Sequence, residues 1–241
     1  GFIVTGTSPK KMILRALGPS LVEAGVPGRL DDPTMELISG ASGSIASNDN
    51  WKDSQQSEIE QTGIPPRDER ESAIVRTLQP GAYTAIVRGK SESTGIAVVE
   101  MYDLEQTTPP RLANVSSRGV VGTDDGVMIG GFIVGAGQGT NGTGSARVVL
   151  RGIGPSLSQS GTANPLSDPE LLLVDGNGSV IRANNDWRET QEAELQATGI
   201  APTNDRESAM VLALPSGNYT AILRGRGGAT GVGLVEAYNV Q

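Results

Sequence analysis

The sequence repeats itself at a fixed distance of 136 residues, and this repeat limits the fold more than any other feature does. "RALGPSL" from Arg15 returns as "RGIGPSL" from Arg151, and "YTAIVRG" from Tyr83 returns as "YTAILRG" from Tyr219. A repeat of this length indicates two copies of one folding unit. All eight Phe, Trp and Tyr residues also fall into pairs between the copies, so we expect these rings to anchor each core.

Within each copy, apolar and β-branched residues recur at every second position between Gly- and Pro-containing turns, which is typical of strands. In the first copy this pattern predicts strands at residues 11–17, 33–38, 43–48, 83–89 and 95–104. Residues 51–64 read as one short helix, with Asp53 and Gln56 as a capping box, Ile59 facing the core and Gly63 in a left-handed conformation. We therefore predict an all-β protein of two tandem antiparallel β-sandwich domains, jelly-roll or Ig-like, each with one short helix.

The predicted boundaries are residues 1–104 for the first domain, 105–111 for a Pro-containing linker and 112–241 for the second domain. Residues 112–130 read as one or two strands that enter the second copy, and the first copy has no counterpart to them. We therefore expect an open strand edge beside "GFIV", which a strand from a second copy of the protein fills. The predicted assembly residues are Gly1, Phe2, Ile3 and Val4 at the acceptor, and Leu112, Ala113, Asn114 and Val115 at the donor, with "VEAYNVQ" as a second candidate donor.

Composition excludes several functions. The net charge of −8 and the lack of a basic stripe argue against a nucleic-acid partner. No apolar run is long enough for insertion into a membrane. Because the chain has neither His nor Cys, His-based catalysis, His metal sites and disulfides are excluded. Ser72 and Ser208 lie in the repeated "RESA" motif, but neither has a suitable general base nearby, so we expect no enzymatic activity.

The motifs "RALGPSL", "NDNW", "ESA" and "YTAIVRG" resemble a tandem module of large secreted or surface bacterial proteins, which is similar to jelly-roll modules of the pre-peptidase C-terminal type. The resemblance covers both copies and implies an extracellular, non-catalytic β-module. Modules of this kind also resemble the subunits of extracellular bacterial fibrils. The expected function is thus a secreted structural protein that assembles with copies of itself into a filament or surface layer and needs no cofactor. The alternative is an accessory module of a secreted hydrolase that binds carbohydrate or Ca²⁺.

Two clusters of polar residues are weak Ca²⁺ candidates, because oxygen ligands are what this ion requires. They comprise Asn48, Asp49, Asn50 and Asp53, with the counterparts Asn184, Asn185, Asp186 and Glu189. Turns that precede the helix are the simpler explanation.

Charged residues inside apolar strands need partners, so we expect ion pairs between Arg15 and Glu100 and between Arg151 and Glu236. Glycans could attach at the sequons of Asn114, Asn141, Asn177 and Asn218, or at Thr107.

Overall fold

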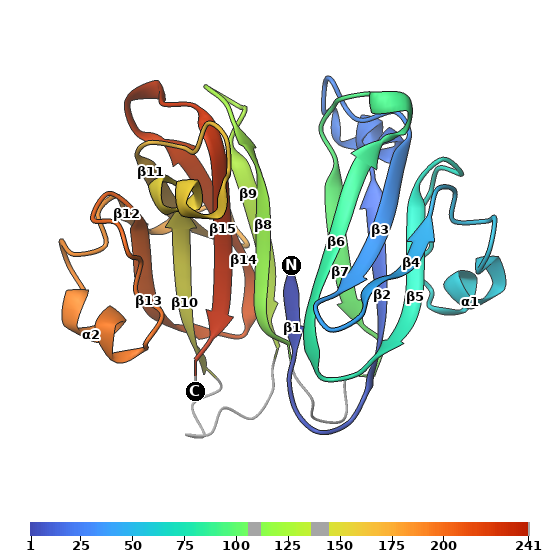
Figure 1. Ribbon diagram of the computed structural model, residues 1–241, viewed down its shortest axis with the longest axis horizontal. Coiled ribbons are helices and arrows are strands. Elements are labelled where there is room, and N and C mark those ends of the chain that lie inside the picture. Colours follow the sequence, from blue (N-terminus) through green and yellow to red (C-terminus); the bar gives the residue numbers. More distant parts are fainter. Residues whose placement is uncertain (106–111, 136–144, 241) are drawn as a thin grey trace. The chain divides into compact units, whose positions relative to one another are not determined.

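A computed structural model of the chain describes residues 1–105, 112–135 and 145–240 (Figure 1). The chain divides into two compact units, Gly1–Leu112 and Ala113–Gln241, which we call unit 1 and unit 2. Strands dominate both units, and the neighbouring strands within each unit are antiparallel. None of the helices in the described residues has the length and apolar character needed to cross a bilayer.

The described residues of unit 1 form seven strands in two sets. β1 (Phe2–Val4), β6 (Gly81–Gly89), β3 (Pro33–Ser39) and β4 (Gly43–Asn48) pair in that order. β5 (Ser72–Leu78), β2 (Lys10–Leu17) and β7 (Val98–Asp103) form the second set, with β2 in the middle. Its helices are α1 (Gln56–Gln61) and the 3-10 turns η1 (Pro19–Ala24) and η2 (Lys90–Glu92).

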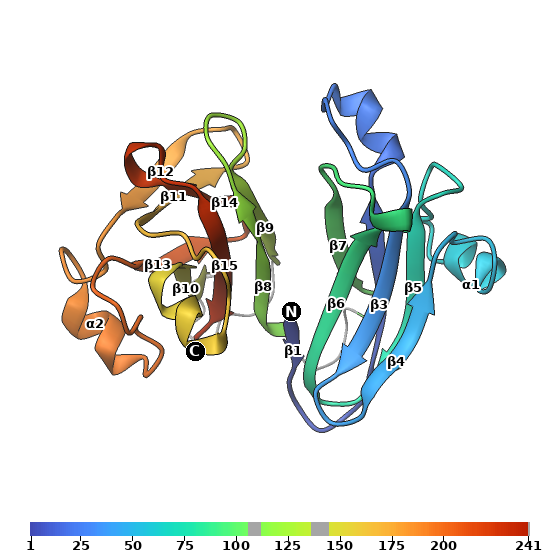
Figure 2. The same ribbon diagram turned by 45° about the horizontal axis from the view of Figure 1, so that its top comes forward.

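The two sets of unit 1 pack face to face around one apolar core. Met12 and Leu14 of β2 meet Met35 and Leu37 of β3 in this core, and all four side chains are buried. The rings of Phe2 and Tyr83 stack at its edge, with centroids 5.4 Å apart. Because alternate residues of a strand face opposite sides, the other face of β2 and β5 needs its own cover, and the α1 segment provides it (Figure 2).

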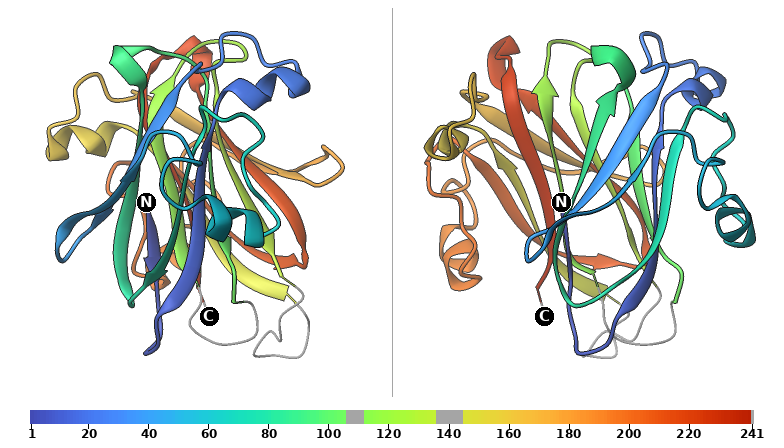
Figure 3. Two further views of the ribbon diagram at one scale, coloured as in Figure 1. Left: turned by 90° about the vertical axis from the view of Figure 1, so that its right-hand side faces the viewer. Right: turned by 45° about the vertical axis from the view of Figure 1, so that its right-hand side comes forward.

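A second small core fills the space under α1. Ile59 of the helix is fully buried, and it packs with Trp51, Ile13 and Val75. Leu195 and Trp187 make the same cluster in unit 2. Figure 3 shows α1 (teal) and α2 (orange) each on the outside of the strands of its own unit.

In unit 2, eight strands in two sets are formed by the residues that the structure describes. β12 (Val180–Asn184), β11 (Pro169–Asp175), β14 (Gly217–Gly225) and β9 (Met128–Val134) pair in that order. β13 (Ser208–Pro215), β10 (Ser145–Ile153), β15 (Gly231–Asn239) and β8 (Leu112–Val121) make the second set. Its helices are α2 (Glu192–Ala197), η3 (Pro155–Ser160) and η4 (Arg226–Gly228).

The strands of unit 1 have counterparts in unit 2 at the corresponding positions of the repeat. These counterparts are paired in the same order in both units, with one difference. β8 lies against β15 in unit 2, but no described strand of unit 1 lies at the matching position on β7. β7 is also shorter than β15, with six residues against nine. β15 has a strand partner on each side, whereas β7 has one among the described residues.

The strands expected from the sequence are confirmed, although the one expected at residues 95–104 forms only over Val98–Asp103, and β5 was not expected. The helix is confirmed in position. Ile59 is buried, and Gly63 has φ of +75° as expected. The capping box is wrong: α1 begins at Gln56 with Gln55 at its N-cap, and no side chain caps the helix. The Gln55 side chain is instead bound to a strand, as described below. Of the predicted linker, residues 106–111 lie outside the described residues.

Candidate functional site

β7 (Val98–Asp103) has β2 on one side, and we call its other side the outward side. This side is more exposed than the matching side of β15 in unit 2. Val99 has 45% of its surface exposed, whereas its counterpart Val235 has 2%. Ile96 and Val98 nearby are 50% and 38% exposed. In unit 2, β8 lies along the same side of β15 and Val121 joins the core beside Val235. We call this side of unit 1 the open β7 edge.

The backbone of the open β7 edge presents hydrogen-bonding groups as well as apolar side chains. The Leu104 N–H donates to the Lys11 carbonyl oxygen at 3.0 Å. Because bonding alternates along an antiparallel pair, Glu100 bonds toward β2, whereas the peptide groups of Val99 and Met101 face away from it. A strand placed along this edge would pair with these groups, as β8 does on β15.

Two acidic residues lie on β7, and both are neutralised within unit 1. Glu100 is paired with Arg15, whose Nη1 also donates to the Ile64 carbonyl oxygen at 2.7 Å. Asp103 is paired with Lys10, whose side chain is only 1% exposed. The open β7 edge therefore carries little net charge.

The glutamate of the second expected ion pair is more buried than the glutamate of the first. Both Nε and Nη2 of Arg151 donate to Glu236 Oε2, and Tyr238 donates its hydroxyl proton to Glu236 Oε1 at 2.8 Å. The side chain of Glu236 is 9% exposed, against 25% for Glu100. Burial raises the pKa of Tyr238 to about 12 and raises the pKa of Tyr102, its counterpart, as well.

The opposite edge of the β5–β2–β7 set, and the matching edge of the β13–β10–β15–β8 set, are each closed by a side-chain amide, which we call the amide clamp. Gln55 Oε1 accepts from the Val75 N–H at 3.1 Å, and Gln55 Nε2 donates to the Val75 carbonyl oxygen at 2.9 Å. Gln191 binds Val211 in the same way, at 3.1 and 3.0 Å. A side-chain amide has the same donor and acceptor as a peptide group. Each clamp thus occupies a site where a further strand would pair.

Several residues of the candidate Ca²⁺ clusters have other partners. The Asn48 oxygen accepts from the Ala73 N–H at 2.9 Å, and the Asn184 oxygen accepts from the Ala209 N–H at 2.8 Å. Asp49 Oδ2 contacts Lys90 Nζ at 2.6 Å. Asn50, Asp53, Asn185, Asp186 and Glu189 lie in the same two loops, and no group of three acidic residues that could hold a metal ion occurs in the described residues.

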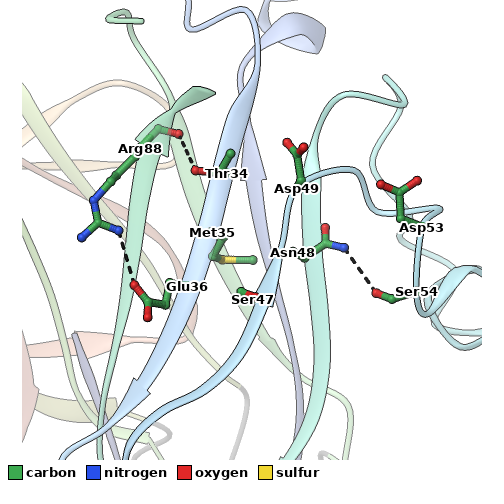
Figure 4. A pocket seen from close by; sticks show the side chains of 9 residues that line it. All are labelled: Thr34, Met35, Glu36, Ser47, Asn48, Asp49, Asp53, Ser54 and Arg88. Carbon is green, nitrogen blue, oxygen red and sulfur yellow. Dashed lines mark hydrogen bonds and ion pairs between the residues drawn. The ribbon is translucent and has the colours of Figure 1, made fainter. Parts of the chain in front are cut away.

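A surface cavity of about 380 Å³ lies between β3, β4 and the loop before α1. Figure 4 shows its polar residues bonded to one another: Arg88 contacts Glu36 at 3.4 Å, and Asn48 Nδ2 donates to Ser54 Oγ at 3.4 Å. Pairing among lining residues leaves few groups for a ligand. Asp49 Oδ1 is buried beside the cavity without a hydrogen-bond partner.

The repeated "RESA" motif has a structural role. Glu71 is fully buried, and its Oε1 accepts from the backbone N–H groups of Gly18 and Ser20 at 3.0 and 2.9 Å. Glu207 holds the "GPSL" turn of unit 2 through the equivalent bonds. Ser72 and Ser208 are buried and donate to the carbonyl oxygens of prolines, so their hydroxyl protons are already bonded.

The predicted assembly residues lie on two strands. Gly1, Phe2, Ile3 and Val4 contain β1, which pairs with β6. Leu112, Ala113, Asn114 and Val115 begin β8, which pairs with β15. "VEAYNVQ" begins within β15, which has strand partners on both sides.

The four sequons differ in accessibility. Asn114 is buried, whereas Asn177 and Asn218 are exposed. Asn141 and Thr107 lie outside the described residues.

The amide clamps and the buried glutamates were not anticipated from the sequence. Gln55 matches Gln191 across the repeat, and Glu71 matches Glu207. Each of these polar residues is identical in both copies and lies next to an apolar strand. This pattern is the signal by which their positions could have been found.

The chain matches no protein-family model and no curated protein sequence. One solved structure, described as "Crystal structure of infectious bursal disease virus VP2 subviral particle", aligns with 99% of this chain at 9% identity and a TM-score of 0.20. The chain spans 58% of that chain. A score this low carries no argument about fold or function.

Proposed function

We propose that this chain is a secreted, non-enzymatic structural protein, built of two tandem β-sandwich domains, that assembles with copies of itself through its strand edges. The observation that carries this proposal is the open β7 edge, where Val99 is 45% exposed although its repeat counterpart is buried. Exposed apolar strand edges recruit further strands, and soluble proteins ordinarily block them.

The amide clamps support the same proposal by contrast. Gln55 and Gln191 close one edge in each unit with paired hydrogen bonds, whereas no such side chain binds the outward side of β7 among the described residues. An edge left unblocked in a set whose opposite edge is blocked indicates a surface used for pairing. The repeated sequence also favours a structural role, because the polar residues shared by the two copies bind backbone groups.

The test is the mass of the purified protein in solution. We expect large particles in sedimentation velocity that persist over a wide dilution series, and regular filaments or sheets in negative-stain micrographs. A monomer at every concentration would contradict self-assembly.

The second candidate is an accessory module that binds carbohydrate or Ca²⁺, which the cavity beside Asp49 favours. Calorimetric titration with Ca²⁺ and with soluble polysaccharides tests it. Binding by a monomer that loses affinity on Asp49→Ala would favour this candidate over assembly.

A further inference from the structure

Six of the eight outer strands of the two units carry a feature that hinders pairing with another strand. β5 and β13 hold the amide clamps. β4 and β12 pair across a register shift, which disrupts an edge. β1 is three residues long, and β8 carries the exposed charge of Arg118. Two outer strands remain, β7 of unit 1 and β9 of unit 2.

β9 has the properties of an unprotected edge strand. Its seven residues, "MIGGFIV", include no charge and no proline. Ile129 and Ile133 on its outer face are 58% and 71% exposed. It pairs with β14 on one side and ends its set on the other, within the described residues. A flat, uncharged and apolar edge of this kind recruits a strand.

We propose that β7 of one copy pairs with β9 of a second copy, in antiparallel orientation, as the contact that joins neighbouring subunits. This inference rests on the proposed function and names the surfaces through which assembly occurs. The two strands are close in length, with six and seven residues. Pairing would place Ile129 and Ile133, which share one face of β9, beside the side chains on one face of β7, and it would satisfy the outward peptide groups of Val99.

Pairing of β7 with β9 is favoured over pairing of β7 with a second β7. Two β7 strands side by side would leave β9, with its exposed Ile129 and Ile133, unpaired in both copies, whereas pairing of β7 with β9 uses both unprotected strands. β9 adds no charge. Each chain also offers one β7 and one β9, so the contact joins different surfaces and can continue from copy to copy.

The test uses lysine substitutions at exposed positions of the two strands. Val98→Lys places a charge on β7, and Ile133→Lys places one on β9. Val180→Lys is the matched control, because Val180 is 59% exposed on β12, an outer strand that the proposal does not use. We expect each of the first two variants to sediment as a monomer at concentrations where the unchanged protein and the control form polymers.

A mixture of the two blocked variants gives the sharper result. The Val98→Lys copy keeps a usable β9 and the Ile133→Lys copy keeps a usable β7, so an equal mixture should form heterodimers and nothing larger. Pairing of β7 with β7 predicts instead that the Ile133→Lys variant dimerises by itself. That result, or unchanged polymers of either variant, overturns the proposal.

Failure of this inference is distinguishable from failure of the proposed function. If the unchanged protein never assembles, both are wrong. If it assembles and the lysine variants assemble equally well, only the pairing of β7 with β9 is wrong. Circular dichroism and thermal unfolding establish that each variant is folded. Val99→Lys and Ile129→Lys, also at exposed positions of β7 and β9, replace any variant that is not, with the same expected outcomes.

Discussion

Removal of the buried Glu71 carboxylate should destabilise unit 1 strongly. In Glu71→Ala, the backbone N–H groups of Gly18 and Ser20 lose their acceptor. A buried donor without a partner costs about 1–3 kcal/mol. The Gly18 bond is fully buried and the Ser20 bond is partly buried, so water can replace only the second. We expect a loss of about 3 kcal/mol from the free energy of unfolding.

Urea denaturation followed by Trp fluorescence measures this loss in unit 1 alone, provided that the Trp of unit 2 is removed. Trp51 is 5% exposed in unit 1, so the Trp187→Phe background leaves one reporter beside the substitution. Glu69→Ala is the control in the same loop, because its side chain is 75% exposed, and it should change stability by less than about 0.5 kcal/mol. A loss below about 1 kcal/mol for Glu71→Ala would refute the role of this carboxylate as the acceptor that holds the turn.

Three further results follow from the same contacts. Glu236→Ala should lower the free energy of unfolding by about 3 kcal/mol and Glu100→Ala by about half as much, because Glu236 is more buried than Glu100. Equal losses in urea denaturation would contradict this order. Gln55→Ala should lower stability by about 1 kcal/mol and increase aggregation measured by light scattering, because it frees the peptide groups of Val75. The free energy of unfolding should decrease as pH rises from about 10 to about 12, because the folded protein holds the Tyr238 proton more tightly than the unfolded chain does. Absorbance measured at alkaline pH should show that Tyr238 ionises at a higher pH than a free tyrosine.

Much of the fold could be predicted because its signals are local. Alternating apolar residues identified the strands, and the repeat transferred each assignment from one copy to the other. Gly63 was predicted to be left-handed because a helix end commonly needs that conformation. Arg15 and Glu100 were matched because charged residues in apolar strands need partners, and the structure places them together.

The choice of edge could not be predicted in this way. Residues 112–134 read as two consecutive strands, and consecutive strands either pair with each other or enter different layers. In unit 2 they separate, since β8 pairs with β15 and β9 pairs with β14. The strand without a counterpart in unit 1 therefore corresponds to an edge on β7 rather than to one beside residues 1–6.

The capping box was wrong for a similar reason. Asp53 and Gln56 have the right spacing to cap a helix, but spacing does not show what else competes for a side chain. Gln55 takes the N-cap position, and its amide binds the edge of β5. A contact between residues far apart in sequence thus decided a local feature.

The amide clamp also limits how a sheet of this protein can grow. Proteins that add strands at both margins of a sheet can widen it indefinitely, which is the route to amyloid. Gln55 blocks one margin of its set, since the peptide group of Val75 is already hydrogen-bonded to the Gln55 side chain. In the assembly proposed above, a new strand is then added only at the other margin. A single glutamine can in this way restrict polymer growth to one direction and limit the width of the sheet, while the opposite margin remains able to pair with a further strand.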